Sequence, residues 1–233
     1  MKKQSTAAAS VTGAVLSSFL LLPLSVNAHE AGDILFRVGA TSVAPDESSS
    51  LISTTATGAL AATSVGVDDS TQLGLNVVYM LTNNWGLEAL AATPFDHDLS
   101  AAGLNQYGFT TTDLGSSKQL PPTISALYFF GSSSSMIRPY VGVGANYTTF
   151  FDKSLSSSAT SELGASNLDI DDSVGLSVRA GVDIQLRGNW FLNASVWNID
   201  IDTDADFDSA LGKVQVGVDI DPMVYMISLG YTF

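Results

Sequence analysis

Eight segments of this 233-residue chain alternate apolar and polar residues with a period of two. In the clearest one, SVGLSVRAGVDIQL at 173–186, the even positions are apolar and the odd positions carry Ser, Gly, Arg, Asp and Gln. This period is typical of a β-strand with one apolar and one polar face. The predicted strands span residues 33–43, 71–82, 85–98, 120–130, 138–151, 173–186, 190–203 and 214–233.

The connections between these strands alternate in length. Short ones at 83–84, 131–137 and 187–189 carry Asn, Gly and Ser, as tight turns require. Long ones at 44–70, 99–119, 152–172 and 204–213 are rich in Ser, Thr, Gly and Asp, and we expect them to be mobile. This pattern predicts an all-β fold, an eight-stranded antiparallel up-and-down transmembrane barrel with four long extracellular loops and three short periplasmic turns. A soluble lipocalin-like barrel, with the apolar face inward, remains the alternative.

The N-terminus predicts export. Lys2 and Lys3 precede a short apolar stretch with Phe19-Leu20-Leu21-Leu22, and Val26-Asn27-Ala28 suits signal peptidase. We therefore expect a cleaved signal peptide at 1–28 and an outer-membrane barrel at 29–233, in a Gram-negative bacterium. A permanent membrane anchor is the alternative, but the apolar stretch is short and contains Pro23.

Charge and composition exclude several kinds of partner. The chain has 9 basic and 23 acidic residues, so removing Lys2 and Lys3 leaves 7 against 23, a net charge of −16. Nucleic acid requires a basic surface, and we expect no such partner. The absence of cysteine removes disulfides and thiol chemistry. We expect no cofactor and no enzymatic activity, because no base with an orienting partner accompanies the two histidines.

The last segment ends on an aromatic residue. Tyr225, Ile227, Leu229, Tyr231 and Phe233 share one face of it. A terminal aromatic on an alternating strand resembles the signal that the outer-membrane assembly machinery recognises, so this machinery is an expected partner through Phe233.

The chain resembles the OmpW family of small outer-membrane proteins. The resemblance rests on TQLGLNVVYMLTNNWGLEALAATPF, LPPT, RPYVGVGANYTTFFD, LNASVWNIDIDT and DPMVYMISLGYTF, together with HEAGD at 29–33. These stretches follow in order along nearly the whole mature chain. One departure is Asn198, where the family leads us to expect an aromatic residue.

The resemblance implies an eight-stranded barrel with an apolar lumen that takes up small hydrophobic molecules and releases them sideways into the bilayer. Leu90 and Trp197 match family positions proposed to constrict the channel, and parity also points Met80 inward. The alternative is that these side chains only fill a narrow barrel, since eight strands leave little more than side-chain space.

Four charged residues share the inward parity: Arg37, Glu88, Arg179 and Asp183. Buried charges must pair, because an isolated one is very costly. We expect a paired network low in the barrel that fixes strand register. A periplasmic plug that forces lateral exit is the second interpretation.

Pro121 and Pro122 are unusual within a strand, because proline donates no hydrogen bond to the ladder. They predict either an opening in the wall near the third and fourth strands, where a lateral gate would lie, or an ordinary junction between loop and strand. His97 is expected at the membrane interface or in a loop.

The run DIDTDADFD at 200–208 is acidic but does not fit an EF-hand loop, because its sixth position is Ala205 and its twelfth is Leu211. We expect a solvated outer rim and no dedicated metal site, with divalent cations bridging the rim to lipopolysaccharide as an alternative.

The sequence therefore predicts a monomeric outer-membrane channel for passive uptake of small hydrophobic molecules, in contact with outer-membrane lipids and lipopolysaccharide. One rival is a receptor, adhesin or structural protein that acts through its loops. Another is a narrow channel for ions or polar solutes.

Overall fold

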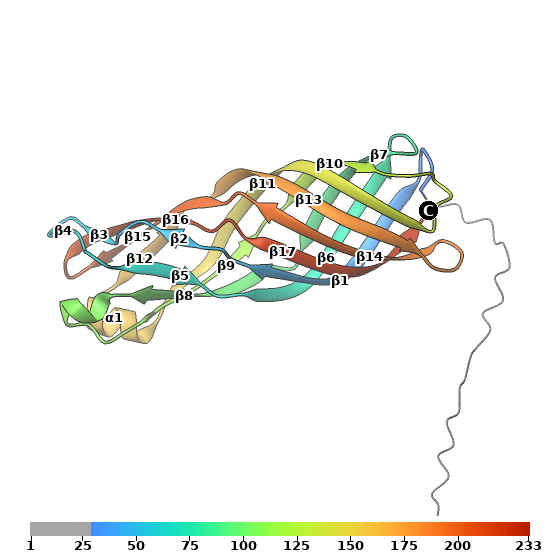
Figure 1. Ribbon diagram of the computed structural model, residues 1–233. Helices are drawn as coiled ribbons and strands as arrows, with labels where there is room; N and C mark the ends of the chain where they lie inside the picture. The colour runs from blue at the N-terminus through green and yellow to red at the C-terminus, as the bar shows by residue number, and fades with distance from the viewer. Residues whose placement is uncertain (1–28) are drawn as a thin grey trace, which may run out of the picture.

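The computed structural model describes residues 29–233 (Figure 1), and the expected signal peptide at 1–28 lies outside them. Strands dominate these residues, with one short helix, α1 (Ser157–Leu163), and a 3-10 turn at Leu104–Tyr107. Within residues 29–233 no helix has the length and apolar character needed to cross a membrane.

Eight antiparallel strands close into a barrel. Each pairs with the barrel strand before and after it in the chain, and the pairing of first with last closes the ring. The predicted fold class is thus confirmed. The strands are β1 (Ile34–Ala44), β6 (Ser70–Met80), β7 (Trp85–Ala92), β10 (Thr123–Phe129), β11 (Ile137–Leu155), β13 (Ser173–Gln185), β14 (Trp190–Ile199) and β17 (Met223–Thr232).

The short connections lie together at the end of the barrel that holds the C-terminus (Figure 1). They join β6 to β7, β10 to β11 and β13 to β14, as expected of periplasmic turns. Two tryptophans, Trp85 and Trp190, begin the strands that follow two of these turns and are about half exposed. Trp190 packs edge-on against Tyr231, which packs against Phe233. Aromatic side chains thus cluster at this end of the barrel.

The apolar face of the barrel points outward. On β13, Val174 and Leu176 are 77% and 65% exposed, whereas Ser177 and Asp183 are each 2% exposed. A soluble barrel would show the reverse arrangement. The outward face is therefore built for lipid, and the polar face fills the lumen.

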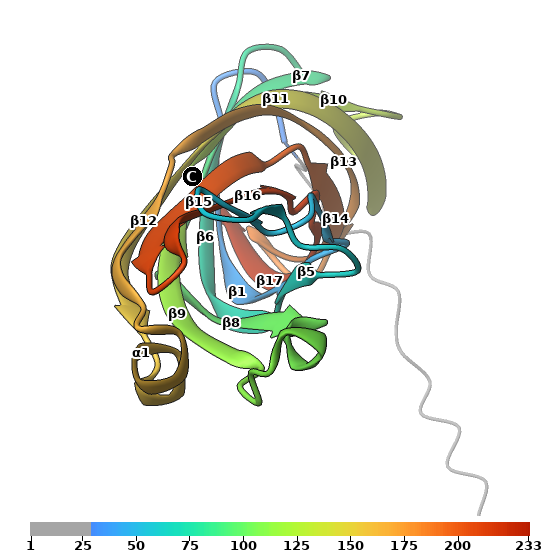
Figure 2. The same cartoon turned by 90° about the vertical axis from the view of Figure 1, so that its left-hand side faces the viewer.

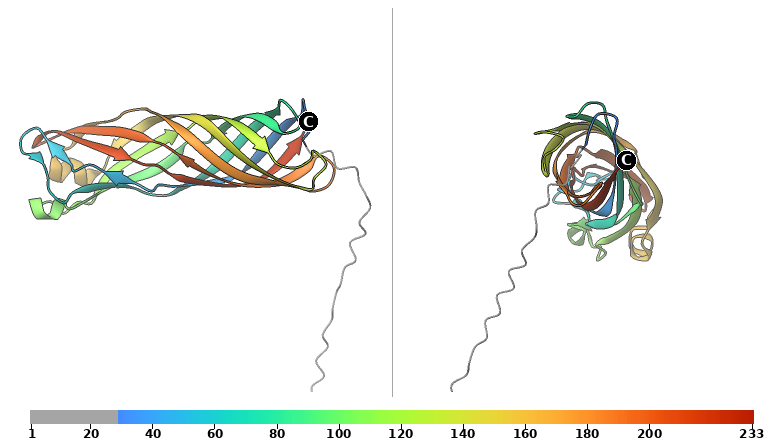
Figure 3. Two further views of the ribbon diagram at one scale, coloured as in Figure 1. Left: turned by 45° about the horizontal axis from the view of Figure 1, so that its top comes forward. Right: turned by 90° about the vertical axis from the view of Figure 1, so that its right-hand side faces the viewer.

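The long connections are not irregular loops, because they contain additional strands that the sequence prediction did not include. About half of their length forms strands that continue the barrel beyond the apolar band (Figures 1 and 3). β8 (Phe95–Ala102) pairs with β9 (Asp113–Leu120), β9 pairs with the outer part of β11, and β5 (Ser64–Val67) pairs with β8. A second sheet contains β12 (Ser166–Ile170), β15 (Asp202–Ser209), β16 (Gly212–Asp219) and the two-residue strands β2 (Ser48–Ser49), β3 (Ser53–Thr54) and β4 (Gly58–Ala59).

Several predicted strands consequently divide in two. Segment 85–98 becomes β7 and part of β8, and segment 214–233 becomes β16 and β17, which belong to different sheets. Segment 190–203 ends at Ile199, and β15 begins at Asp202.

The polarity of the wall inverts in this outer extension. On β16, Val214, Val216 and Val218 are buried, while Lys213 and Gln215 are exposed. Water surrounds the extension, so its apolar side chains turn inward and form a core. Figure 2, viewed from this end, shows the extension strands arranged around a common interior.

Candidate functional site

The four predicted lumen charges lie together in one buried layer. The Arg37 guanidinium lies 2.6 Å from Asp183 and 3.3 Å from Glu88. Arg179 forms an ion pair with the other oxygen of the Glu88 carboxylate. The side chains are at most 2% exposed. Two cations thus face two anions. Arg37 on β1 and Glu88 on β7 each pair with a residue of β13, which lies across the lumen from both strands.

Three further residues complete this layer, and sequence reasoning did not place them there. Nε2 of His29 lies 2.9 Å from Asp183, and its ring packs between Phe129 and Phe191. The Tyr140 hydroxyl accepts hydrogen bonds from Arg179 at 2.6 Å and from the Asn193 amide at 2.9 Å. His29 precedes the first strand, so the alternation of strand residues does not predict which way its side chain points.

The position of Tyr140 depends on a glycine opposite it. A Cβ at Gly181, its cross-strand partner, would lie 2.4 Å from the Tyr140 ring. The missing side chain leaves room for the ring over Gly181, and its hydroxyl reaches Arg179 from there. Inward parity of Tyr140 opposite Gly181 was the available signal.

The three candidate constriction residues do not lie at one level. Leu90 and Trp197 belong to the large buried cluster that extends into the outer extension, and the Arg179 guanidinium lies 4.0 Å from the Trp197 ring centre. Met80 instead belongs to a separate cluster with Phe129 and Phe191. The charge layer therefore has one apolar cluster towards the turns and another towards the outside.

Pro121 and Pro122 lie where the β-ladder is interrupted. The pairing of β7 with β10 ends at Leu90 and Thr123, and that of β8 with β9 begins at Phe95 and Gln119. Four residues, 91–94, face three, 120–122, and the two segments are not paired with each other. Ala91 and Ala92 still pair with β6, and Leu120 still pairs with β11. Pro94 contributes a third imide without a donor. The two prolines thus lie at a junction between two strands, β9 and β10, and the interruption also includes the facing segment between β7 and β8.

The interruption lies near the outer edge of the lipid-facing surface. The Thr93 amide donates to the carbonyl oxygen of Leu73 on β6, and the Tyr147 amide donates to that of Pro122. Leu73, Tyr147 and Ile124, next along β10, are 49%, 48% and 62% exposed. The hydrogen bonds to the flanking strands β6 and β11 thus continue through the interruption, while those between its two facing segments, 91–94 and 120–122, are missing.

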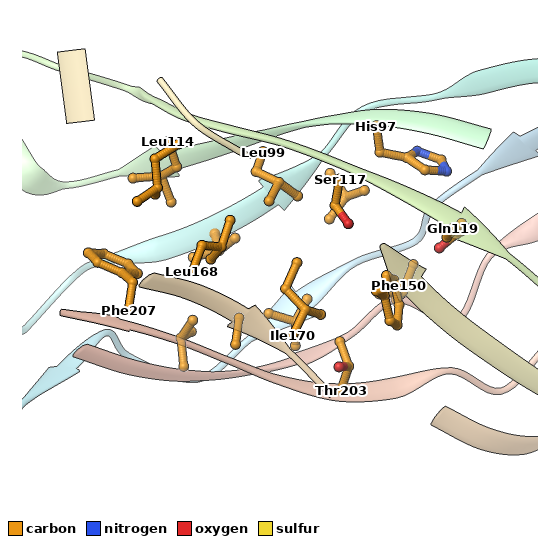
Figure 4. A pocket seen from close by; sticks show the side chains of 17 residues that line it. His97, Leu99, Leu114, Ser117, Gln119, Phe150, Leu168, Ile170, Thr203 and Phe207 are labelled. Carbon is orange, nitrogen blue, oxygen red and sulfur yellow. The ribbon is translucent and has the colours of Figure 1, made fainter. Parts of the chain in front are cut away.

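An apolar cavity of about 50 Å³ lies in the outer extension. Its lining comes from β5, β8, β9, β11, β12, β15 and β16 and is mainly Val, Leu, Ile and Phe. A second cavity of about 40 Å³ adjoins it and shares Val65, Leu114, Phe207 and Val216. In Figure 4, Leu114 and Phe207 lie at one end of the first cavity, and His97, Gln119 and Phe150 gather at the other.

His97 was expected at the interface or in a loop, but it is 4% exposed, lies on β8 and lines the cavity. Its Nδ1 lies 2.6 Å from the carbonyl oxygen of Asp68, and this oxygen can only accept. Burial lowers the pKa of the imidazole, although the hydrogen bond to Asp68 and the charges of Asp96, Asp69 and Asp68 act against this. His97 is therefore neutral near pH 7 with the proton on Nδ1.

The acidic rim lies on the outer surface, as expected. The carboxylates of Asp200, Asp202 and Asp221 lie within 4.8 Å of one another, and all three residues are exposed. Exposed acidic groups commonly gather without binding a metal, and this cluster by itself defines no metal site.

Comparison with known proteins places the chain in a family. A sequence model of the OmpW family matches residues 30–233. Outer membrane protein W of Vibrio cholerae is 43% identical over 222 residues, which cover 94% of this chain and 96% of the relative. Outer membrane protein W of Escherichia coli is 41% identical over 234 residues and is matched along 100% of both chains.

A solved structure agrees with this assignment. The crystal structure of the outer membrane protein OprG from Pseudomonas aeruginosa matches with a TM-score of 0.84 and 41% identity, covering 89% of this chain and 99% of that chain. The sequence resemblance and the predicted location are thus confirmed. The chain belongs to the OmpW family and is an eight-stranded β-barrel of the bacterial outer membrane.

Proposed function

We propose that this barrel takes up small hydrophobic molecules passively, from the outer surface into the bilayer through its wall. The observation that carries the proposal is the position of the interrupted ladder. It lies at the outer edge of the lipid-facing surface, between the apolar cluster of the outer extension and the charge layer. An apolar solute that enters the extension gains from burial at each step, about 25 cal/mol per Å² of apolar area.

The charge layer disfavours a straight path to the periplasm. Arg37, Glu88 and Asp183 are almost fully buried and paired across the lumen, so a solute would have to break charged contacts to pass. Above the layer, Leu90 and Phe95 are buried beside the interruption, one on each side of it. Displacing apolar side chains there costs less than separating ion pairs, which supports lateral exit into the lipid.

A relative is consistent with this class of solute. The Dibenzothiophene metabolism operon protein PahQ of Pseudomonas aeruginosa is 23% identical over 201 residues. Its name links it to an operon for a polycyclic aromatic compound, which is apolar.

Transport can be tested in vesicles with lipopolysaccharide in the outer leaflet. Entry of a small apolar probe is compared with entry of a polar solute of similar size, for wild type and for Trp197→Ala combined with Leu90→Ala. We expect the wild type to accelerate only the apolar probe and the double variant to change that rate. Equal entry with and without protein would overturn the proposal and favour a receptor or adhesin that acts through the outer extension.

The exit route has its own test. Pro121→Ala with Pro122→Ala restores two backbone donors at the interruption and favours continued pairing. We expect slower entry of the apolar probe, whereas Pro139→Ala, on an exposed position of β11, leaves the rate unchanged. An unchanged rate in the double variant would place the exit elsewhere.

The same vesicles distinguish the remaining candidates. If the barrel were a narrow ion channel, the wild type would conduct ions across these vesicles. We expect no such conductance, because the buried charge layer fills the lumen. We also propose that the outer-membrane assembly machinery recognises Phe233. The barrel acts as a monomer in contact with outer-membrane lipids and lipopolysaccharide.

A further inference from the structure

The cavity of the outer extension has one polar end. His97 and Gln119, at 4% and 2% exposure, lie there in walls that are otherwise almost entirely apolar. Neither side chain is needed to fill an apolar core, where leucine would pack without a polar atom to satisfy. Polar groups at one end of an apolar cavity are typical of sites that orient a ligand.

His97 presents an unpaired acceptor at this end. Because Nδ1 donates to the Asp68 carbonyl, Nε2 of the neutral ring carries a lone pair. This atom is enclosed and has no hydrogen-bond partner among residues 29–233. Buried polar atoms are nearly always paired, so an enclosed acceptor on a residue that lines the cavity indicates a missing donor.

We propose that the two adjoining cavities, of about 50 and 40 Å³, bind a small apolar molecule that carries one hydrogen-bond donor, such as a short-chain alcohol, with Nε2 of His97 as the acceptor. The inference rests on the proposed uptake of hydrophobic molecules and names the class of solute. The apolar body lies towards Leu114 and Phe207, and the hydroxyl lies towards His97 and Gln119.

The surrounding charges narrow the class further. A carboxylate offers only acceptors to the Nε2 lone pair and would approach the negative charges of Asp68, Asp69 and Asp96, which act on the His97 ring. An alkane would leave Nε2 unpaired. A site that pairs a ligand hydroxyl discriminates against analogues that lack it, because its own polar atom stays buried and unsatisfied.

Two isomers isolate the donor. 1-Propanol and methoxyethane have the same atoms and a similar shape, and both are small enough for the cavities, but only the alcohol donates a hydrogen bond. The full barrel is placed in lipid nanodiscs, and binding is followed by methyl resonances of Leu99 and Ile170, which line the cavity. We expect the alcohol to bind about threefold to tenfold more tightly, the amount expected from one neutral hydrogen bond. Equal affinities in the wild type would overturn the inference.

The histidines give a direct readout. The chain has only two, His29 and His97, so ¹⁵N-histidine labelling yields few signals. We expect 1-propanol, but not the ether, to shift Nε2 of His97 towards a hydrogen-bonded value and to leave His29 unchanged. A shift of His97 Nε2 by neither isomer would contradict the assignment.

A variant tests the acceptor. His97→Asn keeps an amide that can donate to Asp68 but has no atom at Nε2, so the affinity ratio of the isomers should fall to about one. The alcohol-to-ether affinity ratio is compared between the wild type and His97→Asn, so any difference in how the two isomers partition into lipid cancels. The control Leu114→Met alters the opposite end and should affect both isomers equally. An unchanged ratio in His97→Asn would overturn the inference.

Failure here is separable from failure of the proposed function. The nanodisc experiment measures binding without transport, and the vesicle experiment measures entry without reference to His97. Equal binding of the isomers with faster entry of the apolar probe would remove only the hydroxyl preference. If neither isomer binds, the proposed binding site is refuted, and the uptake proposal is then decided by the vesicle experiment alone.

Discussion

Replacing Glu88 with glutamine should strongly destabilise the barrel, because this carboxylate neutralises two buried cations. Arg37 would retain Asp183 at 2.6 Å. Arg179 would lose its carboxylate and retain the Tyr140 hydroxyl at 2.6 Å and the Trp197 ring. Breaking a buried pair by removing one partner costs about 3–5 kcal/mol. Glutamine keeps the size of the side chain and one acceptor oxygen, so we expect the lower end, about 3 kcal/mol.

The assay is reversible unfolding by guanidinium in phospholipid vesicles. Glu47→Gln makes the same chemical change at an exposed site and should alter the free energy of unfolding by less than about 0.5 kcal/mol. Combining Glu88→Gln with Arg179→Gln restores neutrality of the layer and should recover at least about 1 kcal/mol of the loss. A loss below about 1 kcal/mol in Glu88→Gln, or a double variant no more stable than the single one, would refute the reasoning.

Three further changes test other parts of the structure. Gly39→Ala should destabilise the barrel by about 3 kcal/mol, since the new Cβ would lie 2.0 Å from a backbone carbonyl oxygen of β17, whereas Gly217→Ala meets only a side chain at 3.2 Å and should be mild; chemical unfolding compares them. Because the pKa of His97 is lowered in the folded state, its neutral form contributes stability that is present above the unfolded pKa of about 6.5 and is lost as pH falls below it. The wild type should therefore lose more stability than His97→Asn between about pH 7.5 and pH 5, and a parallel loss would contradict this sign. The Glu162 carboxylate of α1 accepts from the Thr110 amide at 2.7 Å, so Glu162→Gln should speed hydrogen exchange at Thr110, and an unchanged rate would show that other contacts hold this loop.

The charge layer could be predicted because alternation fixes the face of a strand residue without knowledge of the fold. Arg37, Glu88, Arg179 and Asp183 share the inward parity of three strands, and a closed barrel forces inward charges to meet. His29 could not be predicted, since it lies outside any strand and reaches the layer only through the path of the chain end.

The outer extension was missed because its composition was taken as evidence for loops. Ser, Thr, Gly and Asp favour turns, but they also suit the wet face of a sheet in water. Val214, Val216 and Val218 kept the alternation that marks a strand. Beyond the membrane the strand surroundings change from lipid to water, so the apolar face must turn inward. Outward aspartates are therefore compatible with strands there, as outward leucines are within the membrane.

The interrupted ladder joins these two environments, and a single extra residue does so. On β7 the inward residues Glu88 and Leu90 are even-numbered, while on β8 the inward residues Phe95 and His97 are odd-numbered. Across from them, β9 and β10 keep one parity, so four residues face three. An unbroken strand over 85–98 would have turned His97 outward. The slip that unpairs the wall thus also turns the histidine into the cavity, so the candidate exit and the candidate recognition group have the same structural origin.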